Sequence, residues 1–172
     1  VLSSDVNYDL NHTGEVNAEV YEAYATTNLF GFATMNVGRQ ALSYGSGVFV
    51  GVNDWSANRN TVDGMTFAID NDFVDLTVGM ANDNDGAGMS NDRMWLNASK
   101  SSGDWSANLF YSDVTNMSGG VSTEATAMGL DFAYSAMGGA LNLDVSYNTL
   151  TMGDMEMDMM DISGTYSVND DM

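Results

Sequence analysis

The strongest constraint on this chain is an apolar/polar alternation with a period of two residues. Between residues 72 and 80, Leu76 and Val78 fall on one side of the chain and Asp75 falls on the other. Similar runs begin near residues 104, 128, 141 and 160. Alternation over roughly eight residues is typical of a β-strand with one apolar and one wet face. Because no comparable run has a helical period, the pattern predicts an all-β protein.

Turn-forming residues separate these runs. Residues 101–103 and 137–139 are short enough for hairpin turns, whereas we expect longer loops at residues 82–88 and 116–122. Short turns that alternate with long loops, strands of about ten residues and aromatic side chains near the strand tips are typical of a transmembrane β-barrel. A soluble antiparallel sandwich has strands with the same alternation, and the pattern alone does not separate the two folds.

An ordered series of short motifs in the first part of the chain favours the transmembrane barrel over the soluble sandwich. The series comprises Glu22-Ala23-Tyr24, Gly38-Arg39-Gln40, Tyr44-Gly45, Asp54-Trp55 and Asp63-Gly64. It resembles the alginate-export family of bacterial outer-membrane β-barrel porins. This resemblance implies an antiparallel up-and-down transmembrane β-barrel in the bacterial outer membrane. Members of that family are longer, so we expect residues 1–172 to form a single domain that is part of such a barrel, with a polar N-terminal stretch at residues 1–15.

The charge of the chain excludes several classes of function. Lys and Arg total 4 against 24 Asp and Glu, which gives a net charge of −20. Because neutralisation of phosphates needs basic side chains, we expect no nucleic-acid partner. The alginate exporters that this sequence resembles have a basic lumen, so we expect a different solute here. The resemblance and the wet strand faces predict a passive diffusion channel for small hydrophilic solutes or saccharides.

In a barrel of this kind, one face of each strand meets lipid and the other faces the lumen. The side chains expected to face lipid are Val74, Leu76, Val78, Leu109, Leu130, Phe132, Leu141, Leu143 and Val145. Those expected to line the pore are Asp75, Arg93, Asp131, Asp144 and Asp161. Carboxylates in a narrow aqueous passage attract cations and repel anions, which predicts a pore that prefers neutral solutes or, mildly, cations. We expect Arg39 and Arg93 to pair with an acid on a neighbouring strand, with direct solute contact as the alternative.

Motifs for catalysis and metal binding are weak. The single histidine, His12, lies in a polar stretch without a nucleophile pattern, so we expect neither enzymatic activity nor a cofactor. Residues 82–92 carry alternating acids before a glycine, but their register departs from a calcium loop and predicts at most a weak Ca²⁺ site. The methionines of residues 152–160 fit a strand in which Met is an apolar filler, with copper capture as the alternative.

The rival interpretation is a secreted or cell-surface structural β-protein, such as an adhesin or a filament subunit. Its apolar strand faces would pack on one another in a dry core. A barrel would instead place them in an outer belt, with outer-membrane lipid and small hydrophilic solutes as its partners. A homo-oligomer or a larger surface complex is compatible with either interpretation.

Overall fold

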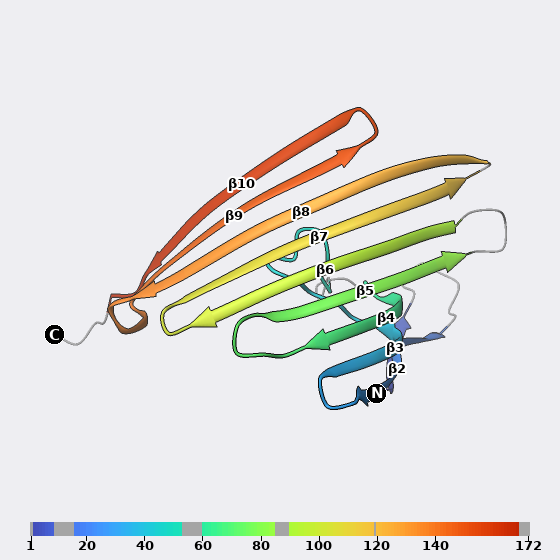
Figure 1. Cartoon of the computed structure of the whole chain (residues 1–172), viewed down its shortest axis with the longest axis horizontal. Coiled ribbons are helices and arrows are strands. Elements are labelled where there is room, and N and C mark those ends of the chain that lie inside the picture. Colours follow the sequence, from blue (N-terminus) through green and yellow to red (C-terminus); the bar gives the residue numbers. More distant parts are fainter. Residues whose placement is uncertain (1, 9–15, 53–59, 85–89, 119, 169–172) are drawn as a thin grey trace.

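Ten β-strands lie side by side in the order in which they occur in the chain (Figure 1). They are β1 (Leu2–Tyr8), β2 (Val16–Leu29), β3 (Ala33–Gln40), β4 (Val62–Ile69), β5 (Asp75–Asn84), β6 (Ser90–Ser102), β7 (Trp105–Ser118), β8 (Val121–Ala136), β9 (Leu141–Met152) and β10 (Met155–Tyr166). Each strand pairs antiparallel with the next, which confirms the all-β, up-and-down fold.

The computed structural model describes residues 2–8, 16–52, 60–84, 90–118 and 120–168. A short 3₁₀ turn, η1 (Met137–Gly139), connects β8 to β9. None of the helical structure in these ranges is long and apolar enough to cross a membrane. The strands β1 and β10 are the two edges of the sheet, and no described residue of one pairs with the other.

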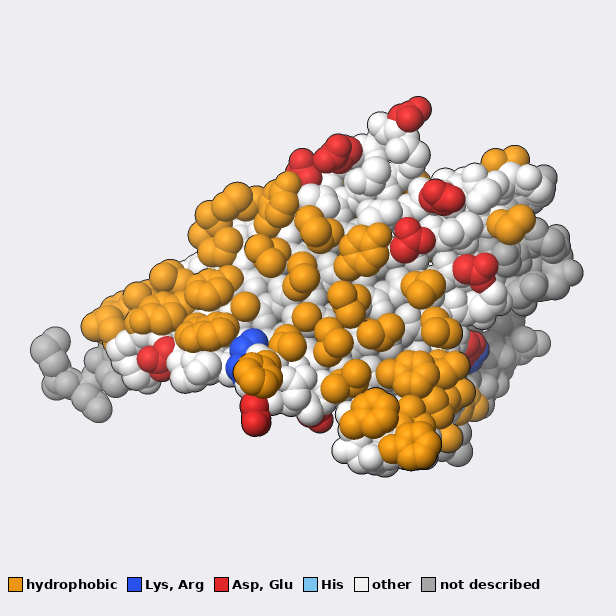
Figure 2. All heavy atoms as spheres, viewed as in Figure 1, with side chains coloured by type: hydrophobic (Ala, Val, Ile, Leu, Met, Phe, Trp, Pro, Cys, Tyr) orange, Lys and Arg blue, Asp and Glu red, His pale blue; other side chains and the backbone are white. Residues whose placement is uncertain are grey.

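One face of the sheet is apolar. Residues that oppose each other in register share a face, so a single row can be followed across neighbouring strands. One such row consists of Ile69, Leu76, Ala98, Leu109, Leu130, Tyr147 and Met160. The expected lipid-facing residues that lie within strands all fall on this face, and Val74 directly precedes β5. Figure 2 shows many hydrophobic side chains on this face of the sheet, which we call the apolar face.

The opposite face, which we call the polar face, carries residues such as Asn97, Asn108 and Ser146. Residues 41–52, which follow β3, turn back over this face instead of extending away from the sheet. The ring of Tyr44 stacks on Phe110 with centroids 5.7 Å apart, and the ring of Phe49 stacks on it at 6.3 Å. The sheet is therefore covered on one side by its own chain.

The turns differ from expectation at two places. The long loop expected at residues 116–122 is wrong, because β7 continues to Ser118 and β8 begins at Val121. The Asn and Ser residues there pair across the ladder, and Gly120, with a φ of 82°, supplies the left-handed conformation that a tight turn needs. The loop expected at residues 82–88 begins later, since β5 runs to Asn84. The short turns expected at residues 101–103 and 137–139 are confirmed.

Candidate functional site: an acidic cavity beneath a folded-back segment

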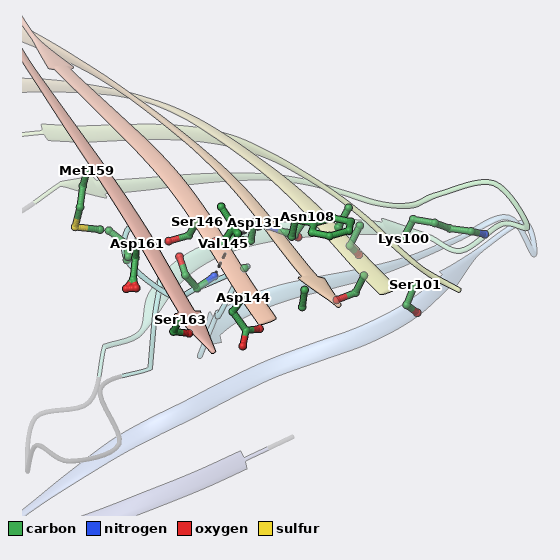
Figure 3. Close-up of a pocket in the computed structure, with 18 of the residues that line it drawn as sticks. Lys100, Ser101, Asn108, Asp131, Asp144, Val145, Ser146, Met159, Asp161 and Ser163 are labelled. Atoms are coloured by element: carbon green, nitrogen blue, oxygen red, sulfur yellow. Dashed lines mark hydrogen bonds between the residues drawn. The ribbon is translucent and has the colours of Figure 1, made fainter. Parts of the chain in front are cut away.

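A cavity of about 740 Å³ opens on the polar face, between the later strands and residues 41–52 (Figure 3). Its acidic lining residues are Asp75, Asp131, Asp144 and Asp161. Serine hydroxyls and the Asn108 amide lie between these carboxylates. Lys100 also lines the cavity, and its ammonium donates a hydrogen bond to the carbonyl oxygen of Asp72. The cavity is thus rich in hydrogen-bond acceptors.

Strand register brings these carboxylates together. Asp131 on β8 opposes Ser146 on β9, which in turn opposes Asp161 on β10. Asp144 occupies the next row, opposite Ala133. Because neighbouring strands lie about 4.8 Å apart, Asp131 and Asp161 are separated by about 10 Å at the backbone. Carboxylates at this spacing, with hydroxyls between them, suit the hydroxyl or ammonium groups of a small hydrated solute better than they suit one tightly held metal ion.

Asp131 also holds the folded-back segment. The backbone N–H of Ser46 donates to Asp131 Oδ2 at 3.1 Å, and Asn108 Nδ2 lies 3.5 Å from the same oxygen. Gly45 has a φ of 54°, and a Cβ at this position would overlap Asp131 Oδ2. A glycine is therefore needed at the point where residues 41–52 touch the acidic cavity.

An aromatic cluster anchors the same segment on β6 and β7. The buried indole of Trp95 donates a hydrogen bond from Nε1 to the Tyr44 hydroxyl at 3.1 Å. Burial raises the pKa of the Tyr44 phenol above its ordinary value, and the hydrogen bond from Trp95 acts in the opposite direction. Gly79 lies opposite Trp95 in register, and a Cβ there would overlap the indole ring. The small residue on β5 thus makes room for the large one on β6.

The family-motif residues that the structure describes have structural roles. Gly38 has a φ of 129°, and a Cβ there would overlap the carbonyl oxygen of Ala23. Gln40 is buried and accepts a hydrogen bond from Thr66 at 3.1 Å. Arg39 forms a two-point ion pair with Asp63 on β4, with Nη2 2.8 Å from Oδ2, which confirms the expected pairing across strands. Asp54 and Trp55 lie outside the described residues.

Arg93 does not lie with the other residues that we expected to line the pore. It is not among the residues that line the acidic cavity. It lines two smaller cavities together with Thr61 and Val62, and it is also among the residues that line a groove with Asp92 and Asp113. Among the side chains that the structure describes, no acid forms an ion pair with Arg93, and the pairing expected for it stays a prediction. Four of the five expected pore-lining residues therefore share one cavity, and Arg93 does not.

The sequence did not identify the buried amides of the polar face. Asn97 and Asn148 are 7% and 3% exposed, on either side of Phe110 and Gly129 in one register row. Among the described residues, no hydrogen-bond partner reaches the buried atoms Asn97 Oδ1 and Asn148 Nδ2. The alternation of side chains along each strand does place these two amides on the same side as other polar residues. Alternation along a strand does not reveal that a distant segment covers them.

The structure describes only part of the expected histidine, calcium and methionine sites. His12 and residues 85–89 of the possible Ca²⁺ loop lie outside the described residues. In the rest of the chain, no group of three or more Asp, Glu, His or Cys side chains is placed to hold a metal ion. The methionines at residues 155–160 lie on the strand β10, and Met159 and Met160 fall on opposite faces of it.

Comparisons of this chain with protein-family models, with curated proteins and with solved structures found no match. The resemblance to the alginate-export family rests on the short motifs alone and stays a prediction.

Proposed function

We propose that this sheet is part of the wall of a β-barrel in the bacterial outer membrane, and that the barrel is a passive diffusion channel for small hydrophilic solutes or saccharides. The observation that carries the proposal is the division of the apolar face into an apolar band and a polar border. On neighbouring strands, the change from apolar to polar side chains occurs at a similar position along the strand.

The band is clearest on β7 and β8. On β7, outward residues run from Trp105 through Leu109 to Tyr111 and then change to Asp113. The neighbouring strand has Tyr134, Phe132, Leu130 and Met128 on the same face and then changes to Thr126. The border across the sheet consists of Asn82, Asp92, Asp113, Thr126, Thr149 and Asp158. Figure 2 shows acidic side chains along the polar border of the hydrophobic region.

Aromatic residues lie at both limits of the band. From Trp105 to Tyr111 the strand advances by about 20 Å at about 3.3 Å per residue, which corresponds to a height of about 15 Å for a strand tilted by about 40°. Outer-membrane barrels carry an outward apolar band about 25 Å tall, with aromatic residues at both interfaces. Here Trp105 and Tyr134 oppose each other at one limit of the band, and Tyr111 and Tyr147 lie near the other. A soluble sandwich needs no such border, because a second sheet would cover the whole apolar face.

The polar face supports the channel part of the proposal. Residues 41–52 narrow the space over this face, and the acidic cavity next to them offers carboxylates and hydroxyls to a hydrated solute. In lipid, every backbone N–H and C=O group needs a partner within the protein. The proposal therefore requires that the edges of β1 and β10 be paired in the membrane, which a closed barrel provides.

The chain contains no cysteine, so single cysteines can report which face meets lipid. We expect Leu130→Cys, in refolded protein in vesicles, to react with a lipid-soluble maleimide and to be protected from a charged one. Ser146→Cys on the polar face should react with the charged reagent. The wild-type protein should also give stepwise conductance in a planar bilayer. A stable, detergent-free protein with Leu130→Cys shielded from both reagents would contradict the proposal and favour the structural β-protein.

A further inference from the structure

We propose that a groove on the apolar face of β3–β7 binds one membrane phospholipid that carries a primary ammonium in its headgroup. The groove would hold an acyl chain, and the carboxylates at its polar end would hold the ammonium. This inference rests on the proposed membrane location and adds a lipid-binding site on the outer surface of the wall.

The groove has a volume of about 590 Å³. A single register row of Val37, Met65, Met80 and Met94 forms its apolar walls. Gly38 and Gly64, which oppose each other in register, also line it, although they alternate with Val37 and Met65 and so belong to the opposite face of the sheet. Methionine side chains are flexible and polarisable, so walls of this kind adapt to an acyl chain.

The polar end of the groove is formed by Asp92 and Asp113, with Asn82 and Thr115 beside them. Asp113 opposes Met94, and Asp92 is two residues from Met94 along β6, so the two aspartates are diagonal neighbours on one face. Diagonal neighbours lie about 7 to 8 Å apart, within reach of one small cation between the two carboxylates. Asn82 donates a hydrogen bond to Asp92, and Thr126 donates one to Asp113 at 3.5 Å.

No base in the described part of the chain neutralises this pair. Arg39 is bound to Asp63. Arg93 also lines the groove, but its side chain belongs to the polar face of β6, opposite to the face that carries Asp92. The carboxylates of Asp92 and Asp113 are both exposed at the polar border, where a lipid headgroup can reach them. A primary ammonium would neutralise them through charge-assisted hydrogen bonds, whereas an anionic headgroup would be repelled.

Charge also argues for a lipid instead of a second copy of the chain. Each copy has a net charge of −20, and a copy seated on this groove would bring further acids to Asp92 and Asp113. An uncharged apolar partner would fill the groove and leave the carboxylates unpaired. A lipid with an ammonium headgroup satisfies both ends of the site.

The test uses the full chain, refolded in vesicles with equal amounts of phosphatidylethanolamine and phosphatidylglycerol. After extraction in a mild detergent, mass spectrometry counts the lipids that remain on each protein. We expect about one retained phosphatidylethanolamine, favoured over phosphatidylglycerol by roughly tenfold, which corresponds to about 1.4 kcal/mol. The double variant Asp92→Asn with Asp113→Asn should lose the preference, and Met80→Trp, which fills the groove, should lose the lipid.

Asp158→Asn is the matched control, because it removes a carboxylate from the same border, on β10, away from the groove. It should leave retention unchanged. Equal or greater retention of phosphatidylglycerol, no retained lipid, or a dimer without lipid would each overturn the inference. Conductance measured on the same preparations separates the two proposals: a conducting protein without lipid preference refutes only the lipid site, and a protein that never enters the bilayer refutes the channel.

Discussion

At the scale of single residues, Tyr44 connects residues 41–52 to the sheet by stacking on Phe110 and by accepting the Trp95 indole N–H. Tyr44→Phe keeps the stacking but leaves a buried donor unpaired. We expect it to lower the free energy of unfolding by about 1 to 2 kcal/mol. Urea unfolding followed by tryptophan fluorescence measures this change. Tyr111→Phe, on the apolar face, is the control and should have a smaller effect.

The same tyrosine predicts a pH dependence. Burial raises the pKa of Tyr44 in the folded protein above its ordinary value of 10.0. The stability that this provides is complete below the unfolded pKa and is lost as the pH rises through the folded pKa. The stability difference between wild type and Tyr44→Phe should therefore shrink between about pH 8 and about pH 11. A difference that grows over this range would contradict the buried position of the phenol.

Gly79 is a second residue whose size matters. A side chain at this position would displace the Trp95 indole, which lies against it. We expect Gly79→Val to lower the free energy of unfolding by about 1 to 3 kcal/mol, as overpacking does in other protein cores. Thr77→Val, on the same face of β5, is the matched control. If the valine displaces Trp95, its hydrogen bond to Tyr44 is already lost. The double variant Gly79→Val with Tyr44→Phe should then lower the free energy of unfolding by less than the sum of the two single variants. Strict additivity would show that the indole keeps its place.

At the scale of elements, β8 offers a test of membrane depth along one strand. Leu130 lies in the middle of the apolar band, and Thr126 lies at its border. Arginine facing lipid costs about 2 to 4 kcal/mol at the bilayer midplane and about 0 to 1 near the interface. We therefore expect Leu130→Arg to be much more destabilising than Thr126→Arg for folding into vesicles. Ala133→Arg, on the polar face, is the control, and equal costs for Leu130 and Thr126 would contradict the proposed band.

At the scale of the whole molecule, the charges are divided between two regions of the polar face. Four carboxylates share one cavity, and Arg93 lines separate cavities. In the proposed channel, the carboxylates would favour cations, and Arg93 would oppose them at another level. This arrangement predicts opposite effects when either region is neutralised.

Asp131→Asn with Asp144→Asn should lower the ratio of cation to anion permeability by roughly twofold at low salt, because it removes two of the charges that attract cations. Asparagine at 131 keeps an acceptor for the Ser46 N–H. Arg93→Gln should raise the same ratio, and Asp158→Asn, on the apolar face, should not change it. Reversal potentials across a planar bilayer measure the ratio. At seawater-like salt the Debye length falls to roughly 4 Å and the differences should vanish. A clear anion preference in the wild type would contradict the predicted selectivity.

The sequence by itself determined the strand character and the face of most side chains. Alternation with a period of two is a local property, since successive side chains of an extended backbone point to opposite sides. Residues such as Leu109, Leu130 and Val145 therefore fell on the expected face, and the aspartates at 131, 144 and 161 fell on the other. Short hairpin connections then aligned those aspartates from neighbouring strands.

Only the tertiary structure decided what covers the polar face. The fold-back of residues 41–52 depends on contacts between Tyr44 and Trp95 and between Ser46 and Asp131, which are 51 and 85 residues apart in the chain. Local periodicity contains no information about such distant pairs, because they follow from how the sheet and its connecting segment pack together in space.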